Sequence, residues 1–223
     1  MKKSSVLIAT TTAIERSGWY HPQLANFLAA AACEAQRGER KLKTLRLDNY
    51  RPIDSARNCA ANEFLKLQFD WLLFLDNDAA PAPGTTLLQM LDQAGPEMDI
   101  VAPRFFVVTG NGRDNEQSLR LGWQLFPGQT VSGEWNEILG CATHCVAIRK
   151  RVLQGMTKPF FQFTYDENGV TKQGEDLNFC EKARAAGFTI WGNNAHEVDH
   201  VHSFSLSVLA RLVSLAQPAQ LVK

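Results

Sequence analysis

Trp71-Leu72-Leu73-Phe74-Leu75-Asp76-Asn77-Asp78 is the stretch of this sequence that decides the fold. Its first five residues are all apolar, which is typical of a β-strand that is buried on both faces. Three polar residues then end the run. Because a strand buried on both faces needs helices on both sides of its sheet, we expect 71–75 to be a central strand of an α/β domain.

Short apolar runs alternate with helical patterns on both sides of this stretch. The expected strands are 6–9, 42–47 and 100–103, and the expected helices are 22–37, 55–67 and 85–93. Such alternation indicates crossover connections between parallel strands. We therefore predict a mainly parallel central sheet with helices on both faces.

The second half of the chain has a different character. Residues 110–135 are rich in Gly, Asn, Gln and Ser, which predicts loops and short antiparallel strands. Further strands are expected at 140–148, 189–191 and 197–202, and helices at 175–186 and 205–216. Gly187 is a favoured helix stop after the first of these helices. The apolar stripe of the last helix is expected to pack on the body, with membrane or partner docking as the alternative.

Length and composition indicate one soluble domain. The chain has 223 residues, of which 45% are hydrophobic, and its 23 basic and 23 acidic side chains cancel. This balance gives no bulk electrostatic reason to favour nucleic acid or an anionic membrane. Five cysteines without CxxC pairs argue against a disulfide framework or a structural zinc site, and they favour the cytoplasm. No apolar run approaches the roughly 20 residues of an integral membrane segment.

Asp76 and Asp78 follow the buried strand directly, and they are the strongest chemical signal. Ligands of open α/β sheets bind at the carboxyl ends of strands, and two carboxylates there can hold Mg²⁺ or Mn²⁺. The alternative is that one acid caps the following turn while the other is solvated. A phosphatase with an aspartate nucleophile is disfavoured, because 79–81 reads Ala-Ala-Pro and the motif lies deep in the chain.

Three stretches, 54–58, 71–78 and 174–180, the last continuing to His200, together resemble the GT-A glycosyltransferases of the family 2 type. The resemblance implies a GT-A (nucleotide-diphospho-sugar transferase) fold with a small antiparallel sheet on the acceptor side. It also implies one domain over residues 1–223. Within it, 1–109 would bind the donor, 110–204 would carry the acceptor site and the catalytic groups, and 205–223 would form a C-terminal helix and tail.

The resemblance implies that several residues at the strand ends bind the nucleotide-sugar donor. These residues are Thr10, Thr11, Thr12, Asp48, Arg57, Asn58, Asp76 and Asn77. Arg57 also stands out on physical grounds, because the first turn of a helix disfavours a cation unless an anion lies nearby. That anion is either a donor diphosphate or the side chain of Asp54.

Glu175 and Asp176 begin a predicted helix, where acids ordinarily serve capping and the helix dipole. The resemblance implies a second use, in which a carboxylate of this pair deprotonates the acceptor hydroxyl. By that likeness we expect Asp176 to be the general base, with Glu175 as second choice or as a ligand of the acceptor.

His200 and His202 alternate on one face of the expected strand 197–202, beyond the acidic strand end. The resemblance implies that His200 binds the metal ion, Mn²⁺ or Mg²⁺, together with Asp76 and Asp78; His202 is the alternative ligand. The other histidines receive no chemical role: His144 and His196 are expected to be structural, and His21 to lie in a lid or at the surface.

The function implied by the resemblance is that of a metal-dependent glycosyltransferase of the hexosyltransferase type, acting with inversion. The donor would be a nucleotide-diphospho-sugar, most readily a UDP-sugar. The acceptor would supply a hydroxyl group, with a saccharide favoured over a lipid-linked glycan, a protein or a modified nucleic acid. Trp123, Phe126 and Trp135 are expected either to stack on a sugar or base or to form a small core. A nucleotidyltransferase and a non-catalytic sugar-nucleotide-binding protein remain the alternatives.

Overall fold

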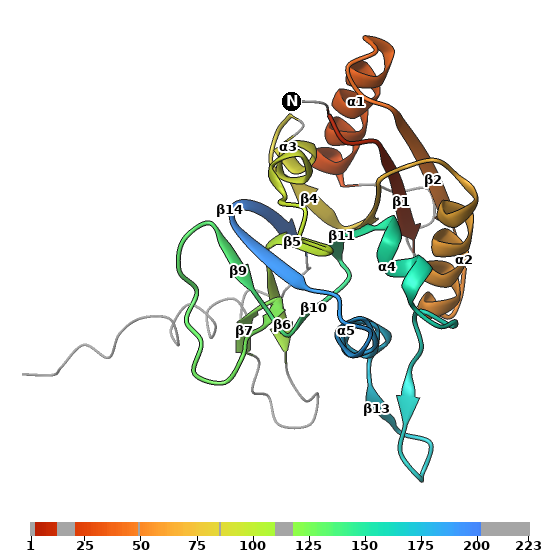
Figure 1. The fold of residues 1–223 in the computed structure, drawn as a ribbon, viewed down its shortest axis with the longest axis vertical. Coiled ribbons are helices and arrows are strands. Elements are labelled where there is room, and N and C mark those ends of the chain that lie inside the picture. The colour runs from red at the N-terminus through yellow and green to blue at the C-terminus, as the bar shows by residue number, and fades with distance from the viewer. Residues whose placement is uncertain (1–2, 13–20, 49, 85, 110–117, 202–223) are drawn as a thin grey trace, which may run out of the picture.

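The sheet is organised around β3 (Trp71–Asp76), whose first five side chains are completely buried. In the computed structural model, which describes residues 3–12, 21–48, 50–84, 86–109 and 118–201, β3 belongs to an eight-stranded sheet (Figure 1). The strand order is β2-β1-β3-β11-β5-β14-β4, and β9 pairs with β14. The prediction of an internal strand that is buried on both faces is confirmed.

Five strands of this sheet run in one direction, and three run against them. The first group is β1 (Val6–Thr12), β2 (Leu42–Asp48), β3, β5 (Ile100–Arg104) and β14 (Ile190–His200); the second is β4 (Ala79–Pro81), β9 (Trp135–Glu137) and β11 (Cys145–Arg149). The sheet is therefore mostly parallel, as predicted. The antiparallel strand β11 lies between β3 and β5, so a late part of the chain separates two early strands.

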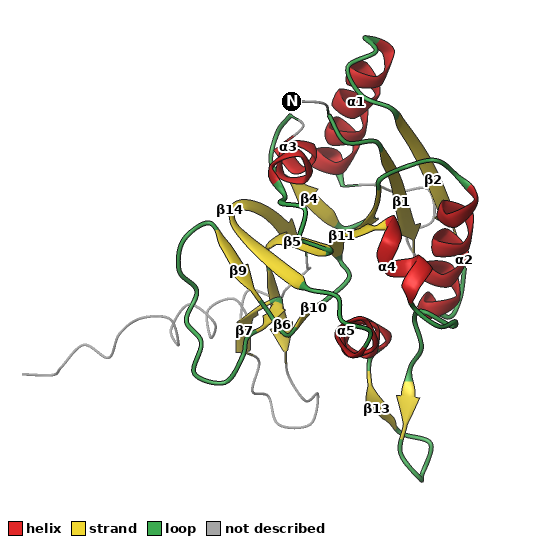
Figure 2. Ribbon diagram, viewed as in Figure 1, coloured by secondary structure: helices red, strands yellow, loops and turns green. Residues whose placement is uncertain are grey.

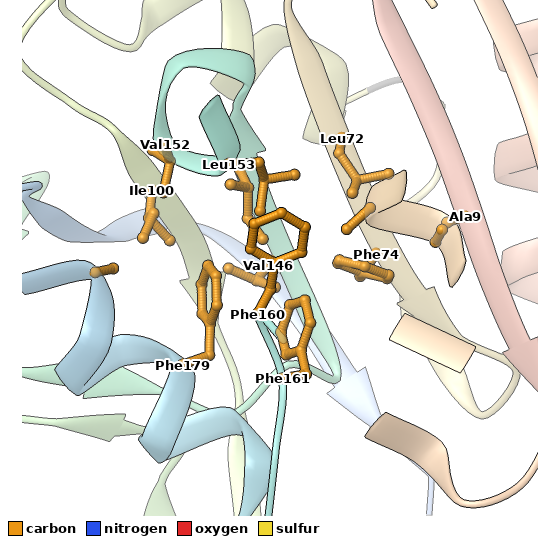
Figure 3. Packing of buried hydrophobic residues seen from close by; sticks show 14 of the residues in the cluster. Ala9, Leu72, Phe74, Ile100, Val146, Val152, Leu153, Phe160, Phe161 and Phe179 are labelled. Carbon is orange, nitrogen blue, oxygen red and sulfur yellow. The ribbon is translucent and has the colours of Figure 1, made fainter. Parts of the chain in front are cut away.

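Helices cover both faces of the sheet because alternate side chains of β3 point to opposite sides. Leu72 and Phe74 pack with α2 (Ile53–Lys66), α4 (Lys150–Gly155) and α5 (Glu175–Ala185) in one buried cluster (Figure 3). Trp71, Leu73 and Leu75 pack with α1 (Pro22–Gln36) and α3 (Thr86–Gln93) in the other. The alternation of strands and helices in the first half of the sequence therefore predicted the layers correctly.

Two strand predictions in the second half need correction. The expected strand 140–148 is divided into β10 (Gly140–Cys141) and β11, because β10 pairs with β8 (Trp123–Gln124) while β11 joins the main sheet. The expected strands 189–191 and 197–202 are one strand, β14, whose pairing with β5 shifts register between Asn193 and Glu197.

The remaining strands form small antiparallel pairs outside the main sheet. β6 (Phe106–Thr109) pairs with β7 (Ser118–Leu121), and β12 (Thr164–Tyr165) pairs with β13 (Thr171–Gln173) in a hairpin that extends away from the sheet (Figure 2). Short antiparallel strands were expected for residues 110–135, where β7 and β8 lie; the hairpin of β12 and β13 was not expected. The predicted helix 205–216 lies outside the described residues. Within the described residues, no helix has the length and apolar character needed to cross a membrane.

Candidate active site

Polar side chains gather where β3 and β14 end, at one edge of the sheet. The loop after β3 carries Asp78, and β14 ends at His200. The backbone N–H of Val201 donates to the carbonyl of Asp78 (3.1 Å), and the backbone N–H of Asp76 donates to the carbonyl of His144 (3.0 Å). These two hydrogen bonds bring three segments that are distant in sequence to one place.

Asp78, His144 and His200 form a compact cluster at this edge. His144 Nδ1 lies 3.6 Å from Asp78 Oδ1, and His200 Nε2 lies 3.6 Å from Asp78 Oδ2. The two imidazole rings are stacked, with centroids 4.0 Å apart and an interplanar angle of 28°. One ligand atom from each of the three residues lies within 4.8 Å of the others, which is a spacing that could hold a metal ion.

His144 is buried and neutral at physiological pH. Burial lowers the pKa of its imidazole to about 4, against the opposite effect of Asp76. Its Nε2 lies 3.4 Å from the carbonyl oxygen of Asp199, and its Nδ1, although buried, has no hydrogen-bond partner within the described part of the chain. A buried acceptor without a partner is costly in a protein interior, unless something else satisfies it.

A divalent metal ion fits this cluster by its chemistry. A carboxylate and two imidazoles are ordinary ligands of Mn²⁺ and similar ions, and the unpartnered Nδ1 of His144 is a lone pair available to one. From the sequence, His144 was expected to be structural. In the sequence, the only sign of a role for His144 is its position directly before the apolar run 145–148. The structure brings His144 to the cluster because β11 pairs antiparallel with β3, with Cys145 opposite Leu75.

Asp76 faces a different set of partners from Asp78. Its Oδ1 accepts a hydrogen bond from Thr11 Oγ1 (2.5 Å), and its Oδ2 accepts one from Arg57 Nη2 (3.4 Å). The nearest contact with the histidine cluster is 3.9 Å, from His144 Nδ1 to Asp76 Oδ2. Asp78 therefore lies in the cluster, whereas Asp76 is engaged by β1 and α2; the convergence of both acids on one ion stays a prediction.

Arg57 joins the acidic strand end to the helix that begins at Glu175. Its guanidinium is buried between Asp76 and Glu175, and Nη1 donates to Glu175 Oε1. Burial raises the pKa of Glu175, and the charge of Arg57 opposes this shift. Among the described residues, the acids paired with Arg57 are thus Asp76 and Glu175 and not Asp54; a contact of Arg57 with a donor diphosphate stays a prediction.

Asp176 differs from its neighbour Glu175 in exposure. Glu175 is buried, whereas Asp176 is half-buried at the start of α5. Asp176 Oδ1 accepts a hydrogen bond from the backbone N–H of Leu177 (2.7 Å). A carboxylate at a helix N-terminus is stabilised in its charged form by the helix dipole. Asp176 is therefore the acid of the pair that a molecule outside the protein can reach.

Asn58, for which the resemblance implied contact with the donor, is engaged in hydrogen bonds within the protein. Its amide nitrogen donates to the carbonyls of Asp54 (2.9 Å) and Phe161 (2.7 Å). Its amide oxygen accepts from the backbone N–H groups of Phe160 (2.9 Å) and Phe161 (3.1 Å). Three of these four hydrogen bonds hold the loop before β12 and the fourth lies within α2, which supports a structural role; the donor-binding role stays a prediction.

The other expected donor contacts lie along the same edge of the sheet. Thr10 is buried in β1, and Asp48 ends β2 opposite Thr12 in the register, with its Oδ2 2.5 Å from Arg46 Nε. Asn77 is buried; its N–H donates to the carbonyl of Thr11 (3.1 Å). His202 lies outside the described residues.

The remaining singled-out side chains are explained by packing or by hydrogen bonds. Trp123 is buried, and its Nε1 donates to the carbonyl of Pro103 (2.9 Å), which agrees with the core alternative. Trp135 packs against the buried cluster of α1 and α3, and the ring of Phe126 lies 4.8 Å from the guanidinium of Arg184. His196 lies 2.9 Å from Asn193 Oδ1, within the irregular part of β14.

A mostly parallel sheet between two helical layers, with acids and histidines at the carboxyl ends of its strands, defines the class of GT-A glycosyltransferases. The particular family follows from the sequence: the model described as glycosyl transferase family 2 matches residues 26–156, which is more than half of the chain. The chain therefore belongs to glycosyl transferase family 2.

Solved structures share this fold at low sequence identity. A197 from STIV has a TM-score of 0.60 and 15% identity, over 89% of this chain and 86% of that one. GalNAc-T7, crystallised with UDP, GalNAc and Mn²⁺, has a TM-score of 0.50 and 12% identity, over 91% of this chain and 44% of that one. S. aureus TarS 1-349 in complex with UDP-GlcNAc has a TM-score of 0.48 and 15% identity, over 91% and 60%. No curated protein sequence matches the chain.

Proposed function

We propose that this glycosyltransferase moves a hexosyl group from a nucleoside-diphosphate sugar, most readily a UDP-sugar, to an acceptor hydroxyl with inversion at the anomeric carbon. The observation that carries the proposal is the buried contact of Arg57 with both Asp76 and Glu175. This contact fixes the start of α5, and with it Asp176, beside the strand end that carries Asp78. A base for the acceptor and a site for the leaving diphosphate are thereby held on one side of the sheet.

The donor would lie along the carboxyl ends of β1, β2 and β3. Thr10, Thr11 and Thr12 end β1, Asp48 ends β2, and Asn77 follows β3. This is the edge at which α/β sheets bind nucleotides. UDP is favoured because GalNAc-T7, which has the same fold, was crystallised with UDP, GalNAc and Mn²⁺.

A divalent ion, Mn²⁺ or Mg²⁺, would be held at the end of β3 by Asp78 and His200, with His202 as a further candidate. When bound, such an ion neutralises the charge that develops on the leaving nucleoside diphosphate. The chain itself keeps Asp76 in place through Thr11 and Arg57. These contacts hold the loop that carries Asp78 in one position.

Asp176 would accept the proton of the acceptor hydroxyl, because it is the reachable carboxylate of the pair at the start of α5. Glu175, which is engaged by Arg57, would position the helix. The new glycosidic bond forms from the acceptor oxygen as the bond to the donor diphosphate breaks on the opposite face of the sugar. A saccharide is the favoured acceptor, and the cytoplasm the expected location.

Donor binding tests the proposal directly. We expect UDP-sugars to raise the melting temperature of the protein in the presence of Mn²⁺ or Mg²⁺, because a ligand that binds only the folded state stabilises it. Removal of the ion with a chelator should abolish this shift in melting temperature. With the ion present, the protein should slowly consume the UDP-sugar and release UDP. A preference for nucleoside triphosphates would point to nucleotidyl transfer. Binding of a UDP-sugar that a chelator leaves unchanged would contradict the metal-dependent mechanism.

A further inference from the structure

We propose that His144 is a metal ligand, so that the ion is held by one carboxylate and two imidazoles, from Asp78, His144 and His200, and not by the carboxylate pair Asp76 and Asp78. The use of this ion in sugar transfer rests on the proposed function. The set of ligands itself is a property of the folded chain and can be tested with a metal ion alone.

The hydrogen bonding of His144 decides which of its nitrogens is free for a metal. A carbonyl oxygen can only accept, so the contact of 3.4 Å with the Asp199 carbonyl places the ring proton on Nε2. The neutral ring then carries its lone pair on Nδ1, the atom that lies 3.6 Å from Asp78 Oδ1. Metal-binding histidines usually donate the proton of the other nitrogen to a carbonyl or carboxylate in this way.

The surroundings of His144 Nδ1 suit a bound cation. The atom is buried and has no hydrogen-bond partner among the described residues. A second imidazole and a carboxylate oxygen face it from His200 and Asp78. A divalent cation between the three groups would satisfy the lone pair of His144 Nδ1 and would also be bound by the carboxylate.

The spacing of the cluster suits one ion. Two atoms bound to the same ion at about 2.2 Å can be no more than about 4.4 Å apart. The ligand atoms of the three residues already lie within 4.8 Å of one another, so only a small inward movement is needed. Asp76 is the poorer candidate, because Thr11 and Arg57 occupy its two oxygens.

Two nitrogen ligands give this site a preference among divalent ions. Mg²⁺ prefers oxygen ligands and keeps several waters, whereas imidazole suits transition metals. We therefore expect Mn²⁺ and Co²⁺ to bind more tightly than Mg²⁺, by roughly tenfold or more. A site built from Asp76 and Asp78 with a single histidine would discriminate less.

Pulsed electron paramagnetic resonance of Mn²⁺ bound to the full chain tests the ligand set without any nucleotide. Protein labelled with ¹⁵N-histidine should show two coordinated histidine nitrogens. His144→Gln and His200→Gln should each leave one, and His202→Gln is the matched control that should keep two. Asp76→Asn should also keep two, because Asp76 is not a ligand in this proposal. Competition with Mg²⁺ should displace Mn²⁺ only at roughly tenfold or greater excess.

The wild-type spectrum keeps the test valid even if His144→Gln fails to fold. One histidine nitrogen in the wild-type protein, or loss of a nitrogen in His202→Gln but not in His144→Gln, would overturn the proposal. Circular dichroism of the metal-free variants separates misfolding from loss of a ligand. If two histidine nitrogens are bound and yet no UDP-sugar binds, the ligand set stands and the proposed function fails. If UDP-sugars bind with Mn²⁺ and only one histidine nitrogen is seen, the proposed function stands and the ligand set fails.

Discussion

Glu175 and Asp176 show at the scale of single residues how two adjacent carboxylates acquire different roles. Glu175 is buried against the guanidinium of Arg57. Asp176 is half-buried, and its carboxylate accepts a hydrogen bond from the backbone N–H of Leu177. Burial and an ion pair suit a residue that holds a structure together. Access from outside suits a residue that exchanges a proton with a substrate.

Replacement of the proposed base should separate catalysis from binding. We expect Asp176→Asn to reduce kcat by about 100- to 10,000-fold, which is the usual contribution of a general base. Its affinity for the UDP-sugar should stay that of the wild type, because the proposed donor site lies at the strand ends. Single-turnover assays and calorimetry measure the two quantities. Glu181→Gln, an exposed position on the same helix, is the control; near-normal turnover of Asp176→Asn would refute the assignment.

The buried carboxylate of Glu175 should leave a trace in the pH dependence of stability. Burial raises its pKa above the usual 4.5, so the folded state binds this proton more tightly than the unfolded state does. The contribution of Glu175 to the free energy of unfolding is therefore fully present below pH 4.5 and is lost as the pH rises through the raised pKa. Glu175→Gln should remove this decline. Urea denaturation of both proteins across this pH range measures it, and identical pH profiles would contradict the raised pKa.

Helix α2 shows at the scale of elements how one helix serves two others. Arg57 contacts the end of β3 and the start of α5, and the next residue, Asn58, binds the loop at Phe160 and Phe161. Glu175, Phe160 and Phe161 are more than 100 positions away in the sequence from the α2 residues that they contact. The position of α5 thus depends on polar contacts as well as on the apolar cluster of Phe74, Phe161 and Phe179 that Figure 3 shows.

Removal of the Asn58 side chain should affect stability and not donor affinity. We expect Asn58→Ala to lower the free energy of unfolding by about 1–3 kcal/mol, because it leaves backbone groups of the loop without partners. Asn62→Ala, one turn further along α2, removes only a contact with Lys158 and should cost far less. Urea denaturation and UDP-sugar titration of both variants give the comparison. A large loss of donor affinity at unchanged stability would restore the donor-binding role.

The whole molecule is tied together by strands that come from distant parts of the chain. β11 lies between β3 and β5, and β14 follows β5, so strands from the second half complete the sheet of the first (Figure 1). The proposed donor and acceptor halves, 1–109 and 110–204, are therefore functional regions that share one sheet. Neither contains the sheet by itself.

A fragment of residues 1–109 should consequently fail to fold on its own. Without β11, the facing edges of β3 and β5 lose their hydrogen-bonding partner, and the buried cluster loses α4 and α5. We expect no cooperative transition in urea, with circular dichroism and near-ultraviolet spectra as the readout. Addition of a second fragment, 110–223, is the matched test for recovery. A cooperative transition of 1–109 alone, with the slope of an intact domain, would show that the halves are separate domains.

The sequence by itself determined the class of fold and indicated the edge of the sheet at which the candidate site lies. The uninterrupted apolar run of β3 required cover on both faces, the alternation of elements gave the layers, and the acids after β3 marked the edge of the sheet. These features are local, since side-chain periodicity and burial are written in neighbouring residues. The resemblance of three separate stretches then gave the family, which the family model confirms.

Only the tertiary structure decided which side chains meet at that edge. It placed His144 beside Asp78, turned Asp76 toward Thr11 and Arg57, buried Glu175, and used Asn58 as a loop contact. These outcomes depend on the pairing of β3 with β1 and β11, and on the contacts of α2 with α5 and with the loop at Phe160 and Phe161. Contacts of this kind join residues that are far apart in the chain, so no local pattern contains them, and they are fixed only when the whole sheet and its helices pack together.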